Sequence, residues 1–235
     1  MDGPLQPLQQ LEEAQSRHPR RRPFITAAYA RSRDGCLARA RGERTELSGP
    51  ESLELTHRLR ALHGALVIGV NTVIADDPLL TTRLAPGPSP LRVVLDTHLR
   101  TPDDARLIGA GAPGTWVACG PDASAAAERR LGDRGVRVLR CPADARGVRL
   151  PAVIAMLARA GVNAIMVEGG ARVLASFVRE HLIDFACVTI APFDLASARA
   201  VTLIEDPLAS PALATRTTQI GRDVVVCASL GEDRT

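Results

Sequence analysis

The chain has 235 residues, of which 46% are hydrophobic and 23% charged, a composition typical of a folded globular protein and unlike a disordered chain or a coiled coil. The formal net charge of +3 is too small to indicate a nucleic-acid partner, and 3% aromatic residues leave few rings on which bases could stack. All 29 basic residues are arginine, which excludes chemistry that needs a lysine amine, such as P-loop nucleotide binding and pyridoxal-phosphate Schiff bases.

The cysteine pattern and the absence of long apolar runs indicate in which compartment the protein is expected. No two of the five cysteines form a CxxC pair, so we expect no zinc site and interpret them as small core residues in a reducing cytoplasm. No apolar run reaches the ~20 residues that span a membrane, and the first residues lack the apolar segment of a signal peptide. We therefore expect a cytoplasmic protein with no membrane segment and no metal.

Residues 1–23 are predicted to be an N-terminal appendage, and residues 24–235 a single domain. Within the appendage, 5–16 has the composition of a short helix, and RHPRRRP (17–23) is a basic linker. We expect the linker to be a solvated tether, with contact to an anionic ligand as the alternative.

Apolar runs alternate with helical patterns from residue 24 onward. Helix signals begin at Ser48, the expected cap, and Pro50, which suits a first turn. A Gly-Arg-Asp turn within 217–230 predicts a terminal antiparallel hairpin. The alternation predicts an α/β fold with a mixed, mostly parallel sheet flanked by helices. Strands are predicted at 24–32, 65–70, 92–97, 115–120, 136–141, 164–170 and 185–192, and helices at 48–63, 122–132, 151–160 and 171–181.

One glycine motif is interpreted as coincidental. GAGAPG (109–114) matches GxGxxG by letter, but that motif binds phosphate only between a strand and a helix. Here a strand follows, and Pro113 interrupts the motif. We predict a loop without a ligand.

A second glycine pair is a better candidate for a ligand site. In VEGGARVL (167–174), an apolar strand ends at Glu168, and Gly169 and Gly170 lead into a helix. Glycines let the backbone approach a ligand closely, and a helix N-terminus offers free N–H groups to a phosphate. The alternative is a tight turn with an exposed glutamate.

A third segment, GVNTVIADDPLLTTR (69–83), follows a buried strand and gathers polar side chains near its end. The neighbouring Asp76 and Asp77 would suit a metal, but Pro78 and the lack of a third carboxylate favour a ligand loop or a capping turn. His57 and His63, on the preceding predicted helix, are interpreted as structural residues.

These segments together resemble a known family. RPFITAAYARSRDG (22–35), THRLRA (56–61), GVNTVIADDPLLTTR, LRVVLDTHLRTP (91–102), GVNAIMVEGGARVLASF (161–177) and LIDFACVTIAP (182–192) occur in the order found in the reductase domain of riboflavin biosynthesis. The resemblance covers about residues 22–192. It implies a dihydrofolate-reductase-like fold, a homodimer, and reduction of the ribosylamino group of a pyrimidinone 5′-phosphate to ribitylamino by NADPH.

The resemblance also implies residue roles. Glu168 is the expected catalytic residue, because a carboxylate beside the ribose would stabilise an iminium. The planar guanidinium of arginine suits the substrate's 5′-phosphate. Substrate-binding positions are Arg60, Leu80, Arg83, Arg44 and Glu168, and cofactor-binding positions are Thr72, Asp76, Thr97, Gly169, Gly170, Ala171, Arg172, Val173 and Leu174.

The sequence departs from the family pattern at four places, all expected on the ligand side. Cys36 replaces a lysine, Arg44 a substrate-contacting serine, Glu46 a cofactor-stacking tryptophan, and residues 193–196 an LLGG segment. These changes leave open a paralogous NADPH reductase with a changed substrate, or a nucleotide-binding module without catalysis. The chain also lacks the HxE…PCxxC zinc deaminase motif that often precedes such domains, so we expect a stand-alone reductase.

Overall fold

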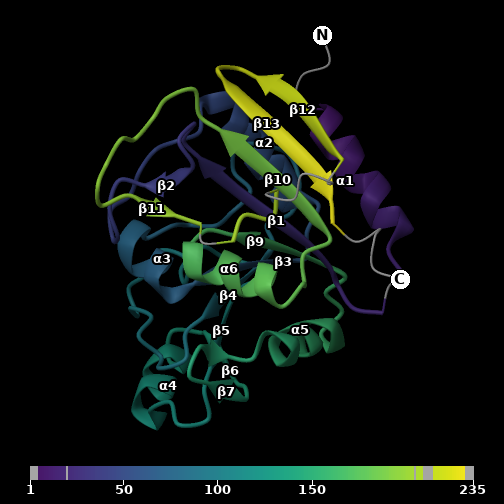
Figure 1. Cartoon of the computed structure of the whole chain (residues 1–235). Helices are drawn as coiled ribbons and strands as arrows, with labels where there is room; N and C mark the ends of the chain where they lie inside the picture. Colours follow the sequence, from purple (N-terminus) through teal and green to yellow (C-terminus); the bar gives the residue numbers. More distant parts are fainter. Residues whose placement is uncertain (1–4, 20, 204, 209–213, 231–235) are drawn as a thin grey trace.

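A nine-stranded sheet with the order β12-β13-β10-β1-β9-β3-β4-β5-β6 forms the centre of the computed structural model, which describes residues 5–19, 21–203, 205–208 and 214–230 (Figure 1). Strands from β10 to β6 pair in parallel, whereas β13 and β12 pair antiparallel. The predicted mixed sheet and terminal hairpin are thereby confirmed. The strands are β1 (Phe24–Arg31), β3 (Ala65–Gly69), β4 (Leu91–Leu95), β5 (Thr115–Cys119), β6 (Arg137–Arg140), β9 (Ala164–Glu168), β10 (Phe185–Ile190), β12 (Thr215–Ile220) and β13 (Asp223–Ser229).

Helices cover both faces of this sheet, so successive strand side chains alternate between two apolar layers. Ile165 and Val167 of β9 share one cluster with α5 and α6. Met166 lies in the opposite cluster with α1 and α2. The same alternation predicts that Glu168 points toward the α2 side, where the site forms. The helices are α1 (Leu5–Arg17), α2 (Pro50–Ala61), α3 (Val70–Asp76), α4 (Ala125–Gly132), α5 (Leu150–Arg159) and α6 (Ala171–Arg179).

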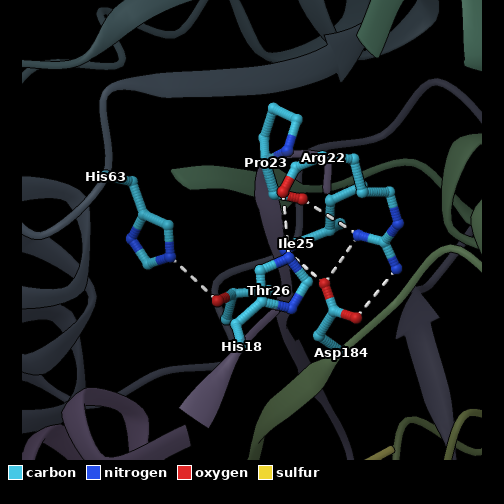
Figure 2. Close-up of polar contacts among 7 residues, drawn as sticks. All are labelled: His18, Arg22, Pro23, Ile25, Thr26, His63 and Asp184. Carbon is cyan, nitrogen blue, oxygen red and sulfur yellow. Dashed lines mark hydrogen bonds and ion pairs between the residues drawn. The ribbon is translucent and has the colours of Figure 1, made fainter. Parts of the chain in front are cut away.

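The N-terminal segment packs on the sheet instead of projecting from it. Helix α1 lies beside β13 and β10, and its Leu11 is fully buried (Figure 1). Arg22 forms a bidentate ion pair with Asp184, at 2.7 and 2.8 Å, while Asp184 also accepts a hydrogen bond from the Ile25 N–H (Figure 2). The expectation of a solvated tether is therefore wrong for Arg22, because a largely buried carboxylate needs a cationic partner. The division at residue 23 stays a prediction.

The start of α2 also differs from the prediction. Its N-cap is Gly49, not Ser48, and no side chain caps the helix. The Gly49 N–H instead donates to the carboxylate of Asp223, 2.7 Å away on β13. A long-range acceptor therefore replaces the local serine cap.

Short elements were missed because they are too brief for a periodic pattern. Helix α3 follows β3 directly, strands β2 (Cys36–Ala38) and β11 (Val201–Thr202) pair with each other, and β7 (Ala143–Asp144) and β8 (Gly147–Val148) form a small hairpin.

The GAGAPG loop covers a buried arginine. Arg92 is fully buried on β4 and donates to the carbonyl of Gly111 and to Thr115 Oγ1. Strand β5 follows the loop, as the sequence predicted. Arg92 is thus an internal partner for the Gly111 carbonyl of the loop, which supports the interpretation of the GAGAPG motif as coincidental.

Candidate functional site

A cleft of about 1590 Å³ opens at the carboxyl ends of the parallel strands β3, β4 and β9. Ligands in open α/β sheets bind at this edge. Every residue to which the sequence analysis gave a site role lines this cleft. The structure thus brings together the substrate-binding and cofactor-binding positions, and their individual roles stay predictions.

The centre of the cleft holds an ion pair between Arg60 of α2 and Glu168 at the end of β9. Arg60 Nε donates to Oε1 at 2.7 Å and Nη2 to Oε2 at 2.6 Å, a bidentate geometry. The two side chains are 10% and 14% exposed. Burial alone would lower the pKa of Arg60, but the facing carboxylate raises it above its ordinary value. The Arg60 guanidinium therefore stays charged and faces the Glu168 carboxylate directly.

This pair changes the expectation for Arg60. The sequence analysis expected its guanidinium to face the substrate phosphate. In the structure three of its five N–H groups are used, two by Glu168 and one by the Thr81 carbonyl at 2.9 Å. Arg60 thus orients the carboxylate and anchors the loop after α3.

That loop carries Leu80 and Arg83, and its backbone is unusual at Asp77 and Leu80. Asp77 and Leu80 have positive φ values of 40° and 54°, which are costly for residues with side chains. Asp77 Oδ1 accepts the Arg106 N–H at 2.8 Å, so this aspartate fixes the loop. Leu80 is buried, and its side chain helps to hold the turn.

Arg83 is an exposed cation of the ligand loop that lines the cleft. Its side chain is exposed, and no hydrogen bond or ion pair of its guanidinium is seen among the residues that the structure describes. Partial burial and the neighbouring Arg60, Arg106 and Arg44 lower its pKa. Three like charges around Arg83 make this end of the cleft attractive to an anion.

The Gly169-Gly170 turn is built for close approach of the backbone. The two glycines have φ values of +86° and +53°. A Cβ at Gly170 would lie 3.1 Å from Thr72 Oγ1, and one at Gly69 would lie 2.8 Å from a methyl of Val173. Thr72 of α3 therefore packs against the turn that begins α6, which leaves the first N–H groups of α6 beside the cleft.

Two further positions that were predicted to bind the cofactor, Asp76 and Thr97, also line the cleft. Asp76 is half-buried, and burial raises the pKa of its carboxyl while Arg44 opposes that shift. Thr97 follows β4 and lies against the β7–β8 hairpin, since a Cβ at Gly147 would be 3.0 Å from Thr97 Oγ1. The hairpin adds Arg146 to the cleft wall, a residue that the sequence analysis did not identify.

Only two of the four departures from the family pattern line the cleft. Arg44 and Glu46 lie on its wall and form an exposed ion pair of 3.3 Å. Cys36 is buried in an apolar cluster with Leu47 and Leu195, because alternation in β2 turns it inward. No residue of 193–196 lines the cleft. The expectation that all four lie on the ligand side is therefore wrong.

Residues 193–196 instead form a structural unit with the β1–β2 turn. Asp34 accepts the N–H groups of Leu195 and Ala196 at 3.2 and 3.0 Å. The hydrogen bond from the Ser32 hydroxyl, together with these two backbone bonds, holds the Asp34 pKa well below its ordinary value. The β1–β2 turn therefore holds residues 193–196 in place outside the cleft.

His57 was predicted to be structural, yet its imidazole contacts the ligand loop. His57 Nδ1 accepts the Arg83 N–H at 3.0 Å. The signal available was its position one helical turn before Arg60, which places both side chains on one face of α2.

The described part of the chain meets the requirements of neither a metal site nor a membrane-spanning helix. No group of three or more His, Cys, Asp and Glu side chains there is arranged to hold a metal ion. Within the same residues, no helix has the length and apolarity needed to cross a bilayer.

Comparison with known proteins agrees with this arrangement. A family model described as the RibD C-terminal domain matches residues 23–226. The chain belongs to the RibD C-terminal domain family. The match runs from β1 into β13 and includes the whole cleft, so the resemblance seen in the sequence is confirmed.

Curated members of the family differ in length. The chain is 36% identical over 187 residues to the 2,5-diamino-6-ribosylamino-4(3H)-pyrimidinone 5′-phosphate reductase of Methanothermobacter thermautotrophicus, covering 78% of this chain and 84% of the relative. It is 36% identical over 172 residues to the riboflavin biosynthesis protein RibD of Aquifex aeolicus, covering 73% of this chain. The chain spans about half of that RibD protein, 47% of its length.

Solved structures show the same fold. The Saccharomyces cerevisiae riboflavin biosynthesis reductase Rib7 superposes with a TM-score of 0.76 at 25% identity, covering 95% of this chain and 97% of that one. Acinetobacter baumannii RibD gives a TM-score of 0.73 at 25% identity, covering 88% of this chain and 58% of that one.

Proposed function

We propose that this RibD-family domain reduces the ribosylamino group of a pyrimidinone 5′-phosphate to ribitylamino, with NADPH as the hydride donor. The observation that supports it most is that one cleft contains the Arg60–Glu168 pair, the exposed cation Arg83 and the Gly169-Gly170 turn. The archaeal relative that this chain matches over 84% of its length is named as such a reductase.

The cleft fits a dinucleotide along the β9–α6 turn. Positive φ at both glycines brings the backbone close to a ligand, and the first N–H groups of α6 face an anion such as a pyrophosphate. Thr72, Asp76, Thr97 and residues 169–174 would hold the cofactor, which supplies the hydride.

The chain's own residues would prepare the substrate. Arg83 binds the 5′-phosphate at the cationic end of the cleft. Glu168, held by Arg60, faces the ribose carbon that accepts the hydride. The ribosylamine would open to an imine; its carbon would accept the hydride that a bound cofactor supplies, and its nitrogen would take a proton to give the ribitylamine. The fixed carboxylate favours the cationic, protonated imine without reorganising during the reaction.

A second candidate is a paralogous NADPH reductase with a changed substrate. The observation that favours it is the Arg44–Glu46 pair, which stands on the cleft wall where the family pattern has serine and tryptophan. A cationic rim would select for a more anionic substrate than a serine does.

We further propose that the protein is a homodimer in the cytoplasm. Strand β12 exposes most of its residues and is the edge strand of the sheet formed by the described residues, a position open to pairing with another chain. The five cysteines are free and buried, which fits a reducing compartment. Light scattering at micromolar concentration should give a mass near twice 25.0 kDa, and a value of 25.0 kDa would exclude the dimer.

The deciding experiment follows NADPH absorbance with the 2-amino and the deaminated pyrimidine phosphates in separate reactions. Oxidation of NADPH with either one supports the proposed reductase and identifies which pyrimidine it uses. NADPH binding without turnover of either would reject it in favour of the changed-substrate enzyme or the non-catalytic module.

A further inference from the structure

Helix α2 holds the ligand loop at two points. Arg60 donates to the Thr81 carbonyl at 2.9 Å, and His57 Nδ1 accepts the Arg83 N–H at 3.0 Å. A longer contact of 3.5 Å joins the same nitrogen to the Leu84 N–H. His57 therefore fixes the peptide from which the Arg83 side chain projects, although 26 residues separate the two in sequence.

This loop needs external support. Asp77 and Leu80 hold positive φ values, and residues in such conformations persist only where their surroundings enforce them. Ser89 Oγ accepts the Thr82 N–H at 3.0 Å on the outer side of the loop. On the inner side, the Arg83 N–H would lose its partner without His57, because the imidazole is the acceptor recorded for it.

The imidazole acts as an acceptor only while it is neutral. His57 is 2% exposed. Burial and two neighbouring guanidinium groups, Arg60 on the same helix and Arg83 on the loop, lower its pKa to about 4. At neutral pH, Nδ1 thus carries a lone pair directed at the loop and the imidazole adds no positive charge to the cleft.

We propose that His57 is a positioning residue for the anion-binding arginine: through Nδ1 it fixes the Arg83 peptide so that the guanidinium faces the substrate phosphate. The proposal rests on the proposed function for the identity of the phosphorylated substrate. It predicts that His57 affects phosphate binding through Arg83 alone, whereas a purely structural histidine would affect all ligands alike.

Two variants separate the acceptor from the ring. His57→Phe keeps a planar ring but has no acceptor, whereas the amide oxygen of His57→Asn stands near the place of Nδ1. Calorimetry with ribose 5-phosphate measures phosphate binding without turnover. We expect His57→Phe to weaken ribose 5-phosphate about tenfold and to raise the KM of the pyrimidine phosphate similarly, with kcat and NADPH affinity within about twofold of wild type. His57→Asn should restore most of the affinity.

A double variant tests the route through Arg83. If His57 acts by positioning Arg83, His57→Phe should cause no further loss of ribose 5-phosphate affinity in an Arg83→Ala background. Additive losses, or wild-type affinity in His57→Phe, would overturn the proposal. If His57→Phe does not fold, His57→Gln replaces it, because its amide oxygen lies one methylene farther out and misses the loop; wild-type affinity there would also overturn the proposal.

Failure of the proposed function gives a different result. A protein that turns over neither pyrimidine phosphate but still shows the predicted order of ribose 5-phosphate affinities, with wild type and His57→Asn above His57→Phe, retains the positioning role and loses the reductase assignment. A protein that reduces the pyrimidine with the same KM in all three forms retains the reductase and loses the positioning role.

Discussion

Arg60 and Glu168 lie 108 residues apart in sequence and meet through two parallel hydrogen bonds of 2.7 and 2.6 Å at the centre of the cleft. Strand β9 alternates its side chains so that Glu168 faces α2, and Arg60 projects from the buried face of that helix. The pair thus joins the carboxyl end of the sheet to the helix that supports the ligand loop.

Removal of either partner should destabilise the fold. Arg60→Met or Glu168→Gln leaves a largely buried group without its counterpart, so each should lower the free energy of unfolding by about 3 kcal/mol. The double variant should lose less than the sum of the two. Urea denaturation at pH 7 measures the cycle, and strict additivity would show that the two side chains do not interact.

A matched control lies on the same helix. Arg58 and Glu54 also form an ion pair, at 2.6 Å, but both are substantially exposed. Arg58→Met and Glu54→Gln should each cost less than about 1 kcal/mol, because exposed pairs are weak.

The kcat of a Glu168→Gln variant tests whether turnover needs the negative charge of Glu168 or only its shape. Glu168→Gln keeps an acceptor oxygen but removes the negative charge that would stabilise a protonated imine. We expect kcat to fall on the order of 10²-fold with NADPH affinity little changed. Steady-state kinetics with the preferred pyrimidine measures this, and unchanged kcat would leave Glu168 as a positioning group for the ribose.

The order of the large elements could be predicted because each strand and helix is long enough to show its period. The β12–β13 hairpin was recognisable from its Gly221-Arg222 turn. Strands of two or three residues, such as β7 and β11, contain too few residues for a pattern. The Gly49–Asp223 cap could not be foreseen, because it depends on which distant strand lies beside the helix.

The sequence predicted which residues line the candidate site but not which of them pair with one another. Motif positions at strand ends converge on one edge of a parallel sheet, which is why the expected residues line one cleft. Which side chains pair with one another depends on three-dimensional register, so the ion pair between Arg60 and Glu168 was not predicted, while phosphate binding by Arg60 stays a prediction. Cys36 was placed in the cleft by motif position, whereas strand alternation buries it.

The cofactor placement is tested at Gly170. Gly170→Val puts a side chain on a backbone with φ of +53° and against Thr72 Oγ1, so it should abolish NADPH binding by displacing the turn. Fluorescence titration with NADPH measures this. Gly161→Ala is the control, because Gly161 also has positive φ, +83°, but open space around its Cβ and no place in the cleft. Unchanged NADPH affinity in Gly170→Val would exclude this cofactor site.

Arg83 should distinguish substrate from cofactor. Arg83→Ala removes the free cation of the ligand loop, and loss of a charge-assisted bond to phosphate should weaken the substrate roughly 10- to 150-fold. NADPH affinity should change little. Arg58→Ala, which removes an arginine from α2 outside the cleft, is the control. Equal losses for both ligands in Arg83→Ala would indicate a distorted fold or a wrong assignment.

Two buried histidines should make the fold sensitive to mild acid. Burial lowers the pKa of both His57 and His63 from 6.5 to about 4. His63 forms hydrogen bonds with the Leu59 carbonyl and the Thr26 hydroxyl. Figure 2 shows the bond between His63 and Thr26. Below pH 6.5 the unfolded chain therefore binds protons that the folded chain does not, and the free energy of unfolding falls as the pH drops toward 4.

Between pH 7 and pH 5 this loss should be about 1–2 kcal/mol for each histidine, measured by urea denaturation. The raised pKa of Asp76 acts in the opposite sense, since the folded state then binds the extra proton. A variant comparison isolates the histidine contribution: His57→Asn should lose less stability than wild type over this interval, whereas His98→Asn, at an exposed position, should lose as much. An equal pH dependence in wild type and His57→Asn would mean that His57 is not held neutral by its surroundings.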